Sequence, residues 1–184
     1  MNRPRRAGPL LAGAALTAAV LAVHRARRRL LVVTVDGSSM LPALCDGDVL
    51  LVRRLTARDR AAALAVGRIV VAEAPVPPVA RPAWSWPGAD EPAERRGWTV
   101  KRVAALPGDP WPGALGDGAR GDGGAAVGPH TVVLLGDNAE ASIDSRQIGG
   151  FPQERVAGVV LRVLSSTGRN PVPGGNGGPL ARSC

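Results

Sequence analysis

The sequence predicts a mostly β domain that follows an apolar N-terminal segment. Three observations indicate this fold class. Short runs rich in valine and leucine alternate with turns that contain glycine or proline, which is the pattern of antiparallel strands. No stretch shows the length and 3.6-residue periodicity of a long amphipathic helix. One uncharged, apolar run at residues 8–23 stands between basic flanks, as a membrane anchor does.

This apolar run is the first element. Its length is at the short end of the roughly 17–25 residues that a spanning helix needs, and it could also be the core of a secretory signal. No small-residue cleavage site separates it from His24 and Arg25, so we favour an uncleaved anchor. Residues 1–29 are therefore expected to form a basic N-terminus and a single transmembrane helix. By the positive-inside rule alone, the arginines after the run favour a cytoplasmic position for the following domain.

Six strands are expected between residues 30 and 165. Each is a run of aliphatic and β-branched residues that is bounded by a turn signal. Pro42 marks the turn between the first two runs, Gly67 opens the third, and a Pro107-Gly108 turn ends the fourth. The expected strands cover residues 30–35, 48–55, 68–74, 98–106, 131–137 and 155–164.

The remaining segments are predicted to lack regular structure. Prolines interrupt residues 75–97 and exclude a regular element there, and residues 107–129 are again rich in glycine and proline. The tail at residues 166–184 has too few apolar side chains to join a core and is expected to be disordered. The chain is thus divided into an anchor region at 1–29, one β domain at 30–165 and a tail.

Charge and cysteine content argue against several classes of function. The net charge is +8, but seven of the arginines lie before residue 30, and the rest of the chain is close to neutral. A nucleic-acid interface needs clustered positive charge on the folded part, so no nucleic-acid partner is expected. Cys45 and Cys184 lack the spacing of a metal site, and we expect no structural disulfide, metal or other cofactor. Asp46 and Asp48 fit turn residues better than a calcium loop.

Lys101 is the only lysine among 23 basic residues. A buried amine can lose its proton near neutral pH, whereas a guanidinium cannot. A lone lysine in an arginine-rich chain is therefore a candidate general base, Schiff-base nucleophile or modification site. On count alone, the alternative remains open that a compositional bias removed lysine and that one survived by chance.

Three separated segments carry the candidate chemistry. The first, D-G-S-S-M-L-P at 36–42, has a serine on a tight turn after a strand, which suits an exposed nucleophile beside free backbone N–H groups. The second, V-K-R-V-A-A-L-P-G-D at 100–109, places the amine on a buried strand, where desolvation disfavours its charged form. The third is G-D-N-A-E-A-S-I-D-S-R-Q-I-G at 136–149. The first two predict a Ser/Lys dyad.

These segments resemble three sequence boxes of the type I signal peptidase family, whose members are membrane-bound serine proteases. S-M-L-P at 39–42 matches the first box, K-R at 101–102 with P-G-D at 107–109 matches the second, and G-D-N with S-I-D-S-R matches the third. The boxes occur in the family's order across nearly the whole folded region. The resemblance implies a signal-peptidase-like antiparallel β domain behind a transmembrane helix.

The resemblance also implies roles for the residues of the dyad. Ser39, which directly precedes Met40, stands at the nucleophile. Ser38 is its rival in the raw sequence, but the spacing to the methionine and the proline selects Ser39. Lys101 stands at the general base, and Ser142 stands at the hydroxyl that holds the lysine amine.

Further residues would support this site. Asp144 and Arg146 stand at a supporting ion pair. Met40 resembles a residue of the substrate cleft, although it could also simply fill the core. Some members of the family have a hydroxyl two residues before the nucleophile that helps the oxyanion hole. Here that residue is Gly37, so the hole is expected to rely on the backbone N–H of Ser39.

The function that the resemblance implies is removal of N-terminal signal peptides from exported preproteins by a membrane-anchored serine endopeptidase. Its partners would be preprotein signal peptides and membrane lipid. The catalytic domain would lie on the extracytoplasmic side of the cell membrane, opposite to the side that the flanking charges favour. Two alternatives remain: a maturation protease of the same family that serves few substrates, and an inactive membrane-anchored peptide-binding module, which would be expected to lose Lys101.

The other candidate residues are interpreted as structural or peripheral. His130, the one histidine outside the anchor region, would have to serve a Ser-His-Asp triad, but it follows a Gly-Pro pair and is expected at the surface. Trp84 and Trp86 flank proline-rich loops. They could cap the core, but we favour an apolar rim at the lipid interface, where tryptophan is common.

Overall fold

The computed structural model describes residues 29–77, 84–88, 96–115 and 126–166. The predicted anchor at 8–23 and the predicted tail from 167 onward lie outside these residues. In the part of the chain that is described, no helix combines the length and the apolar character needed to cross a membrane.

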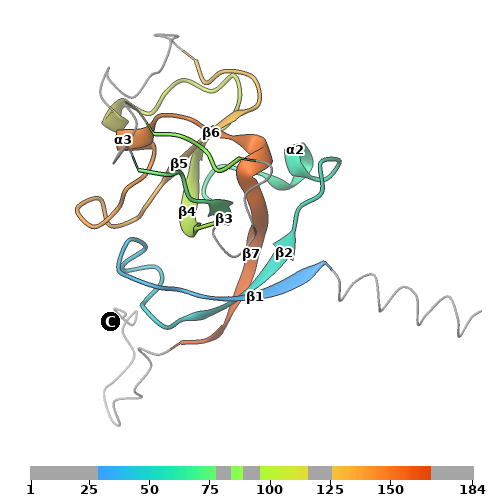
Figure 1. Ribbon diagram of the computed structural model, residues 1–184, viewed down its shortest axis with the longest axis vertical. Coiled ribbons are helices and arrows are strands. Elements are labelled where there is room, and N and C mark those ends of the chain that lie inside the picture. Colours follow the sequence, from blue (N-terminus) through green and yellow to red (C-terminus); the bar gives the residue numbers. More distant parts are fainter. Residues whose placement is uncertain (1–28, 78–83, 89–95, 116–125, 167–184) are drawn as a thin grey trace, which may run out of the picture.

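A single antiparallel sheet of seven strands forms the described domain and confirms the prediction of a mostly β fold (Figure 1). The order across the sheet is β1-β2-β7-β3-β4-β5-β6. All six predicted runs form strands that begin and end within two residues of the predicted bounds. The strands are β1 Leu30–Thr34, β2 Val49–Arg54, β3 Ile69–Glu73, β4 Trp98–Ala105, β5 Thr131–Leu135, β6 Phe151–Pro152 and β7 Val156–Ser165.

Strand β7 joins the two parts of the sheet. Its first residues pair with β3, where Val159 lies opposite Val70, and most of its length pairs with β2. Figure 1 shows this long strand between the β1–β2 hairpin and the group formed by β3, β4 and β5. Because β7 is shared, the hairpin and that group belong to one sheet, and loops from both can meet at one place.

The core explains why these runs become strands. Strand β4 alternates buried and half-buried positions along its second half, with Lys101, Val103 and Ala105 on the buried side. Val103 packs with residues of β3, β5 and β7 around the fully buried Phe151. Lys101 therefore occupies a position where the strand pattern would otherwise place an apolar side chain. A second apolar cluster connects the β1–β2 hairpin to β3 and contains Val35, Met40, Leu44, Leu50, Val52 and Val71.

The helices of the described residues are short, and the sequence pattern does not reveal them. The α-helices are α2 Arg60–Ala63 and α3 Ser145–Ile148, and the two 3-10 turns are η2 Gly113–Leu115 and η4 Gln153–Arg155. A four-residue helix contains about one turn, which is too short to show a hydrophobic period. Strand β6 was missed for the same reason, since two residues cannot show alternation.

Trp86 does not form part of a lipid-facing rim, so that expectation is wrong. Its ring packs edge-on against the buried ring of Phe151, with 5.1 Å between the ring centroids. The guanidinium of Arg155 lies 5.9 Å from the centre of the Trp86 ring and binds the buried carboxylate of Glu73 at 2.6 Å. The loop around Trp86 is thus held on the core by an aromatic contact and a buried ion pair. Trp84 is half-buried.

The expectation of no structural disulfide is also wrong. Cys45 is buried, with 6% of its surface exposed, and it is disulfide-bonded. The other cysteine of the sequence, Cys184, lies outside the described residues. Spacing along the chain does not report which cysteines come close in space, so the sequence could not indicate this bond.

Candidate active site

The loop between β1 and β2, residues 35–48, contains Ser39 and is called the nucleophile loop below. Gly37 has a φ of 87°, a left-handed conformation that glycine adopts at little cost. Its N–H donates to Asp46 Oδ1 at 2.8 Å. The buried carboxylate of Asp48 accepts a hydrogen bond from the N–H of Cys45 at 3.0 Å. Asp46 and Asp48 are therefore turn residues, as the sequence predicts, and they shape the return of the chain to β2.

The structure brings Ser39 and Lys101 together. Lys101 Nζ lies 3.0 Å from Ser39 Oγ, which is within hydrogen-bonding distance. Lys101 is on β4, opposite Val70 of β3, and only 3% of it is exposed. The amine thus approaches Ser39, the serine that the spacing selects, across two segments that are far apart in sequence.

Burial lowers the pKa of the Lys101 amine below its usual value of 10.5. The Asp144 carboxylate acts against this shift, and the Arg146 guanidinium adds to it. The net shift favours the neutral amine, which is the form that can accept a proton. An amine with a lowered pKa beside a serine hydroxyl can act as a general base toward it.

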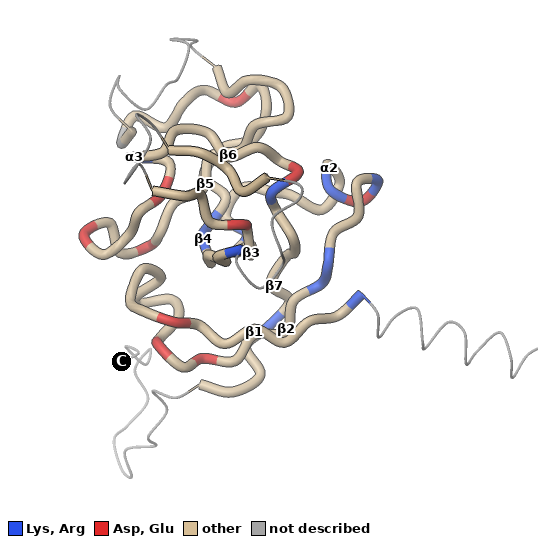
Figure 2. The backbone as a smooth tube through the Cα atoms, in the orientation of Figure 1, with Lys and Arg blue, Asp and Glu red and all other residues tan. Residues whose placement is uncertain are grey.

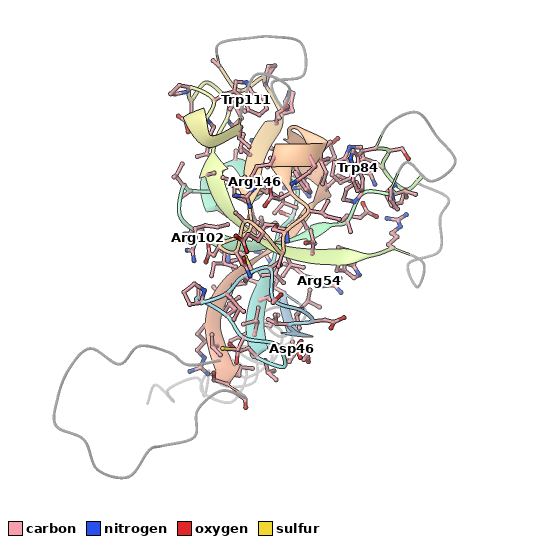
Figure 3. The ribbon with its side chains drawn as sticks, turned by 90° about the vertical axis from the view of Figure 1, so that its left-hand side faces the viewer. Asp46, Arg54, Trp84, Arg102, Trp111 and Arg146 are labelled. Atoms are coloured by element: carbon pink, nitrogen blue, oxygen red, sulfur yellow. The ribbon has the colours of Figure 1, made fainter. Side chains whose placement is uncertain are left out.

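The turn that follows β5 is tied to β4 beside the lysine. Leu135, the last residue of β5, pairs with Arg102 of β4. The Arg102 guanidinium donates two hydrogen bonds to Asp137, at 2.8 and 2.6 Å, and one to the carbonyl of Gly67, at 2.7 Å. In Figure 3, Arg102 and Arg146 lie in the middle of the molecule, between Trp111 at the top and Asp46 at the bottom. The residue next to the candidate base is thus fixed to this turn.

The same turn also holds the nucleophile loop. Asn138 donates from its backbone N–H to the Ser39 carbonyl at 3.0 Å, and from its side-chain amide to the Ser38 carbonyl at 3.2 Å. Gly136 permits this close approach, because a Cβ there would lie 2.2 Å from Ser142 Oγ and 2.7 Å from the Ser39 carbonyl oxygen. Consecutive residues of one turn therefore position both members of the candidate dyad.

Asp144 organises the third segment of the site. Its carboxylate is fully buried and accepts hydrogen bonds from Ser142 Oγ at 2.7 Å, from the Gly136 N–H at 2.8 Å and from the Arg146 guanidinium. Asp144 is also the N-cap of α3, where its carboxylate accepts from the Arg146 N–H and Gln147 completes a capping box. The structure therefore places the predicted ion pair of Asp144 and Arg146 in direct contact.

The positions of Ser142 and Met40 agree less directly with the roles that the resemblance implies. Ser142 is buried, and its hydroxyl donates to Asp144, not to the lysine amine. Met40 is 1% exposed and packs in the apolar cluster beneath the β1–β2 hairpin. That position suits a core residue, and its part in a substrate cleft stays a prediction. His130 is exposed at the start of β5, as the sequence predicts for a surface histidine.

Sequence reasoning missed two residues that shape the site. Asn138 belongs to the G-D-N segment, which marks the position but gives no sign that its side chain binds the nucleophile loop. Ser145 is fully buried, and its hydroxyl accepts a hydrogen bond from the Leu134 N–H at 3.0 Å, which joins α3 to β5. A serine in a polar segment gives no sign of such a contact until the fold places it.

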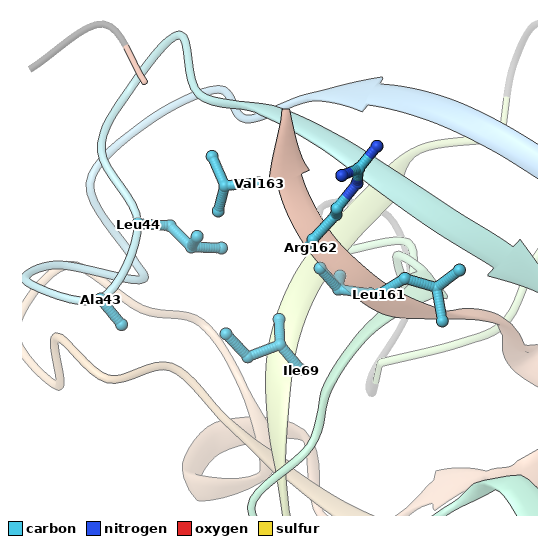
Figure 4. A pocket seen from close by; sticks show the side chains of 7 residues that line it. Ala43, Leu44, Ile69, Leu161, Arg162 and Val163 are labelled. Atoms are coloured by element: carbon cyan, nitrogen blue, oxygen red, sulfur yellow. The ribbon is translucent and has the colours of Figure 1, made fainter. Parts of the chain in front are cut away.

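An open groove of about 370 Å³ lies beside the nucleophile loop (Figure 4). Its walls come from that loop, from the start of β3 and from β7, and they are mainly aliphatic. Neither Ser39 nor Lys101 lines it. The lining residues are Ala43, Leu44, Ile69, Val160, Leu161, Arg162 and Val163. Among the described residues, no group of three or more His, Cys, Asp or Glu side chains could hold a metal ion.

The fold and the site have the features of a serine hydrolase, with a serine hydroxyl set beside a buried amine on an antiparallel β domain. Comparison with known families agrees. The sequence model of the family described as signal peptidase, peptidase S26, matches residues 10–110, more than half of the chain. The chain therefore belongs to this family, and membership implies serine peptidase activity. A search of curated proteins finds no match.

The family match contains the nucleophile loop and β4, but not the third segment at 136–149. The structure supplies that connection, because the turn after β5 bonds to both of the other segments, and the cap of α3 is bonded to that turn. The three boxes that the sequence shows in order thus converge at one place in the fold.

Proposed function

We propose that this protein is a membrane-anchored serine endopeptidase that removes N-terminal signal peptides from exported preproteins, with Ser39 as nucleophile and Lys101 as general base. The observation that carries the proposal is the 3.0 Å distance between Lys101 Nζ and Ser39 Oγ at a buried lysine. An amine accepts a hydroxyl proton only when it is neutral, and burial favours that form. Membership of the signal peptidase family supports the choice of substrate.

In the proposed reaction, neutral Lys101 takes the hydroxyl proton of Ser39 while Oγ attacks the scissile carbonyl carbon. The carbonyl oxygen becomes an oxyanion, which the Ser39 backbone N–H stabilises. When the intermediate collapses, the C–N bond breaks, the leaving amine takes the proton from Lys101, and the acyl group remains on Ser39. Water then gives a proton to Lys101 while its oxygen attacks the acyl carbon. When this second intermediate collapses, the C–O bond to Ser39 breaks and Ser39 Oγ takes the proton back from Lys101.

The third segment supports the base in this proposal. The Asp144 carboxylate, held by Arg146 and by the Gly136 N–H, fixes the Ser142 hydroxyl near the dyad. From there Ser142 can turn to hold the lysine amine during the reaction. Met40, beneath the nucleophile loop, would form the floor of the substrate cleft.

The proposed membrane location rests on the apolar run at 8–23, which ends a few residues before β1 begins at Leu30. In the proposal this run is a single-pass anchor, and the domain lies on the extracytoplasmic side of the cell membrane. Signal-peptide cleavage sites emerge there at the lipid surface. The dyad acts without a metal or other cofactor.

Cleavage of a preprotein tests this proposal. The full chain, solubilised in detergent, is incubated with a generic preprotein, and the products are mapped by mass spectrometry. We expect one cut at the end of the signal peptide and none with Ser39→Ala. His130→Asn is the matched control, because position 130 is exposed and its φ of 61° is one that asparagine tolerates. Cleavage that survives Ser39→Ala would contradict the proposal.

A further inference from the structure

Asn138 contacts the two carbonyl groups next to the nucleophile. Its side-chain Nδ2 donates to the Ser38 carbonyl oxygen at 3.2 Å, and its backbone N–H donates to the Ser39 carbonyl oxygen at 3.0 Å. The Ser38 oxygen also accepts from the Leu41 N–H at 3.2 Å, which closes a turn around Ser39. Both acceptor positions of the Ser38 oxygen are thus occupied, and the direction of this carbonyl is set.

The direction of the Ser38 carbonyl decides where the Ser39 N–H points. These two groups belong to one peptide unit, and in a planar trans peptide they point in opposite directions. A side chain that holds the carbonyl on one side therefore directs the N–H to the other side. The Ser39 N–H is the donor that the proposed mechanism uses for the oxyanion.

Residue 37 adds little to the Ser39 N–H in stabilising the oxyanion. Gly37, where a side-chain hydroxyl could otherwise assist, has no side chain. Its own N–H is engaged by Asp46 at 2.8 Å. The hole therefore depends on how well the Ser39 peptide unit is oriented, and preorganised donors are effective only when they are already aimed at the developing charge.

We propose that Asn138 is a positioning residue for the oxyanion hole, whose carboxamide holds the Ser38 carbonyl and thereby orients the Ser39 N–H. The inference rests on the proposed function only in that Ser39 is the nucleophile. The hydrogen bonds of Asn138 run to the nucleophile loop and not to Lys101, so proton transfer to the lysine is left unchanged.

Two substitutions remove the carboxamide donor and keep the backbone N–H. Asn138→Ala deletes the side chain. Asn138→Asp keeps its shape but places a carboxylate oxygen against the Ser38 carbonyl oxygen. Glu140→Gln is the matched control, because it exchanges a carboxylate and a carboxamide at an exposed position of the same loop. Thermal unfolding of each full-length variant in detergent shows whether it is folded.

The reaction to measure is hydrolysis of a small activated ester, alongside preprotein cleavage. Loss of one oxyanion donor costs about 100- to 1000-fold in kcat, and a donor that is misdirected but still present should cost less, about 10- to 100-fold. We expect this fall in kcat for both Asn138 variants, with KM nearly unchanged. Glu140→Gln should match the parent.

A second readout separates orientation of the hole from a general disturbance of the site. When a peptide aldehyde binds, Ser39 Oγ adds to its carbonyl carbon, and the former carbonyl oxygen points into the oxyanion hole. The same peptide with a reduced scissile amide has no oxygen at that position. Asn138→Ala should weaken aldehyde binding by a factor similar to its loss of kcat, and it should bind the reduced peptide as the parent does. The pH at which the rate rises should stay where it is in the parent.

Several results would overturn the inference: unchanged ester hydrolysis in both folded variants, equal weakening of aldehyde and reduced peptide, or a pH profile displaced in Asn138→Ala. Ester hydrolysis that survives Ser39→Ala would overturn it as well. Failure of the proposed function looks different, since a parent that hydrolyses the ester through Ser39 but cuts no preprotein would contradict signal-peptide cleavage and leave the Asn138 result standing.

Discussion

At the scale of single residues, the lone lysine carries the most information about this chain. The chain uses arginine for every other basic residue, and the one amine lies buried within 3.0 Å of a serine hydroxyl. A surface charge would gain nothing from that position, and a buried cation would be costly there. The neutral amine removes this cost, and in the proposed function it accepts the Ser39 proton. The alternative that Lys101 survived a compositional bias by chance therefore does not fit its buried position beside Ser39.

The substitution Lys101→Arg distinguishes a base from a plain charge. Arginine stays protonated in proteins, so it cannot accept the Ser39 proton, and activity should fall as far as it does in Ser39→Ala. Members of a catalytic unit give losses that do not add, so the double variant should be no worse than either single one. Rates of ester hydrolysis by the three variants check this. A Lys101→Arg variant with parent-like rates would remove the dyad.

Replacement of the lysine by methionine should show what its burial costs. A base whose folded-state pKa is lowered binds fewer protons when folded, so the parent gains stability as the pH rises toward the unfolded value near 10.5. Lys101→Met lacks this ionisable amine, so its stability lacks this contribution to the pH dependence. Its melting temperature should exceed that of the parent at neutral pH, and the difference should shrink as the pH approaches 10.5. Calorimetry over this range would refute the idea if the difference stayed constant or grew.

At the scale of elements, the turn after β5 decides whether the site forms. It binds β4 through Asp137 and Arg102, and it binds the nucleophile loop through Asn138. The cap of α3 reaches the same turn, because Asp144 accepts from the Gly136 N–H. One tight turn therefore connects three elements, and its shape depends on a glycine with no room for a side chain.

Gly136→Ala should damage both stability and activity. A Cβ would lie 2.2 Å from Ser142 Oγ and 2.7 Å from the Ser39 carbonyl oxygen, so the turn or the nucleophile loop must move. Overpacking of this kind costs about 1–3 kcal/mol in the free energy of unfolding. Denaturant unfolding measures this cost. Gly113→Ala is the control, since a Cβ there meets no atom within 4 Å, and equal stability of the two variants would contradict the close approach.

At the scale of the whole molecule, one shared sheet brings distant segments together and leaves charge unevenly spread. Figure 2 shows basic residues just before β1, at the end of β2 and at α2, whereas many of the acidic residues lie in the nucleophile loop and in the loops near α3.

The side of the membrane on which the domain lies can be tested directly. The family resemblance implies the extracytoplasmic side, whereas the arginines that follow the apolar run favour the cytoplasmic side. Protease added to intact spheroplasts should digest the β domain of the full-length chain without lysis. A cytoplasmic marker protein must stay intact in the same sample. Protection of the domain until the membrane is lysed would overturn the outward orientation.

Much of this protein could be predicted from its sequence. The six longer strands show an alternating or continuous apolar pattern, and such patterns are local properties that the sequence displays. Local signals also mark the serine turn and Lys101, namely a glycine turn after a strand and an amine within an apolar run, whereas the resemblance to the family selects Ser39 over Ser38. What these features have in common is that each depends on neighbours within a few residues.

Only the tertiary structure decided the contacts between distant segments. That Ser142 binds Asp144, that Trp86 packs on Phe151, and that Asn138 holds the carbonyls beside the nucleophile all depend on how strands from different parts of the chain are registered. Hydrogen bonds require distances and angles within narrow limits. A sequence pattern specifies which faces are buried, but it does not specify those distances, because they arise only when the sheet has assembled and the turns meet.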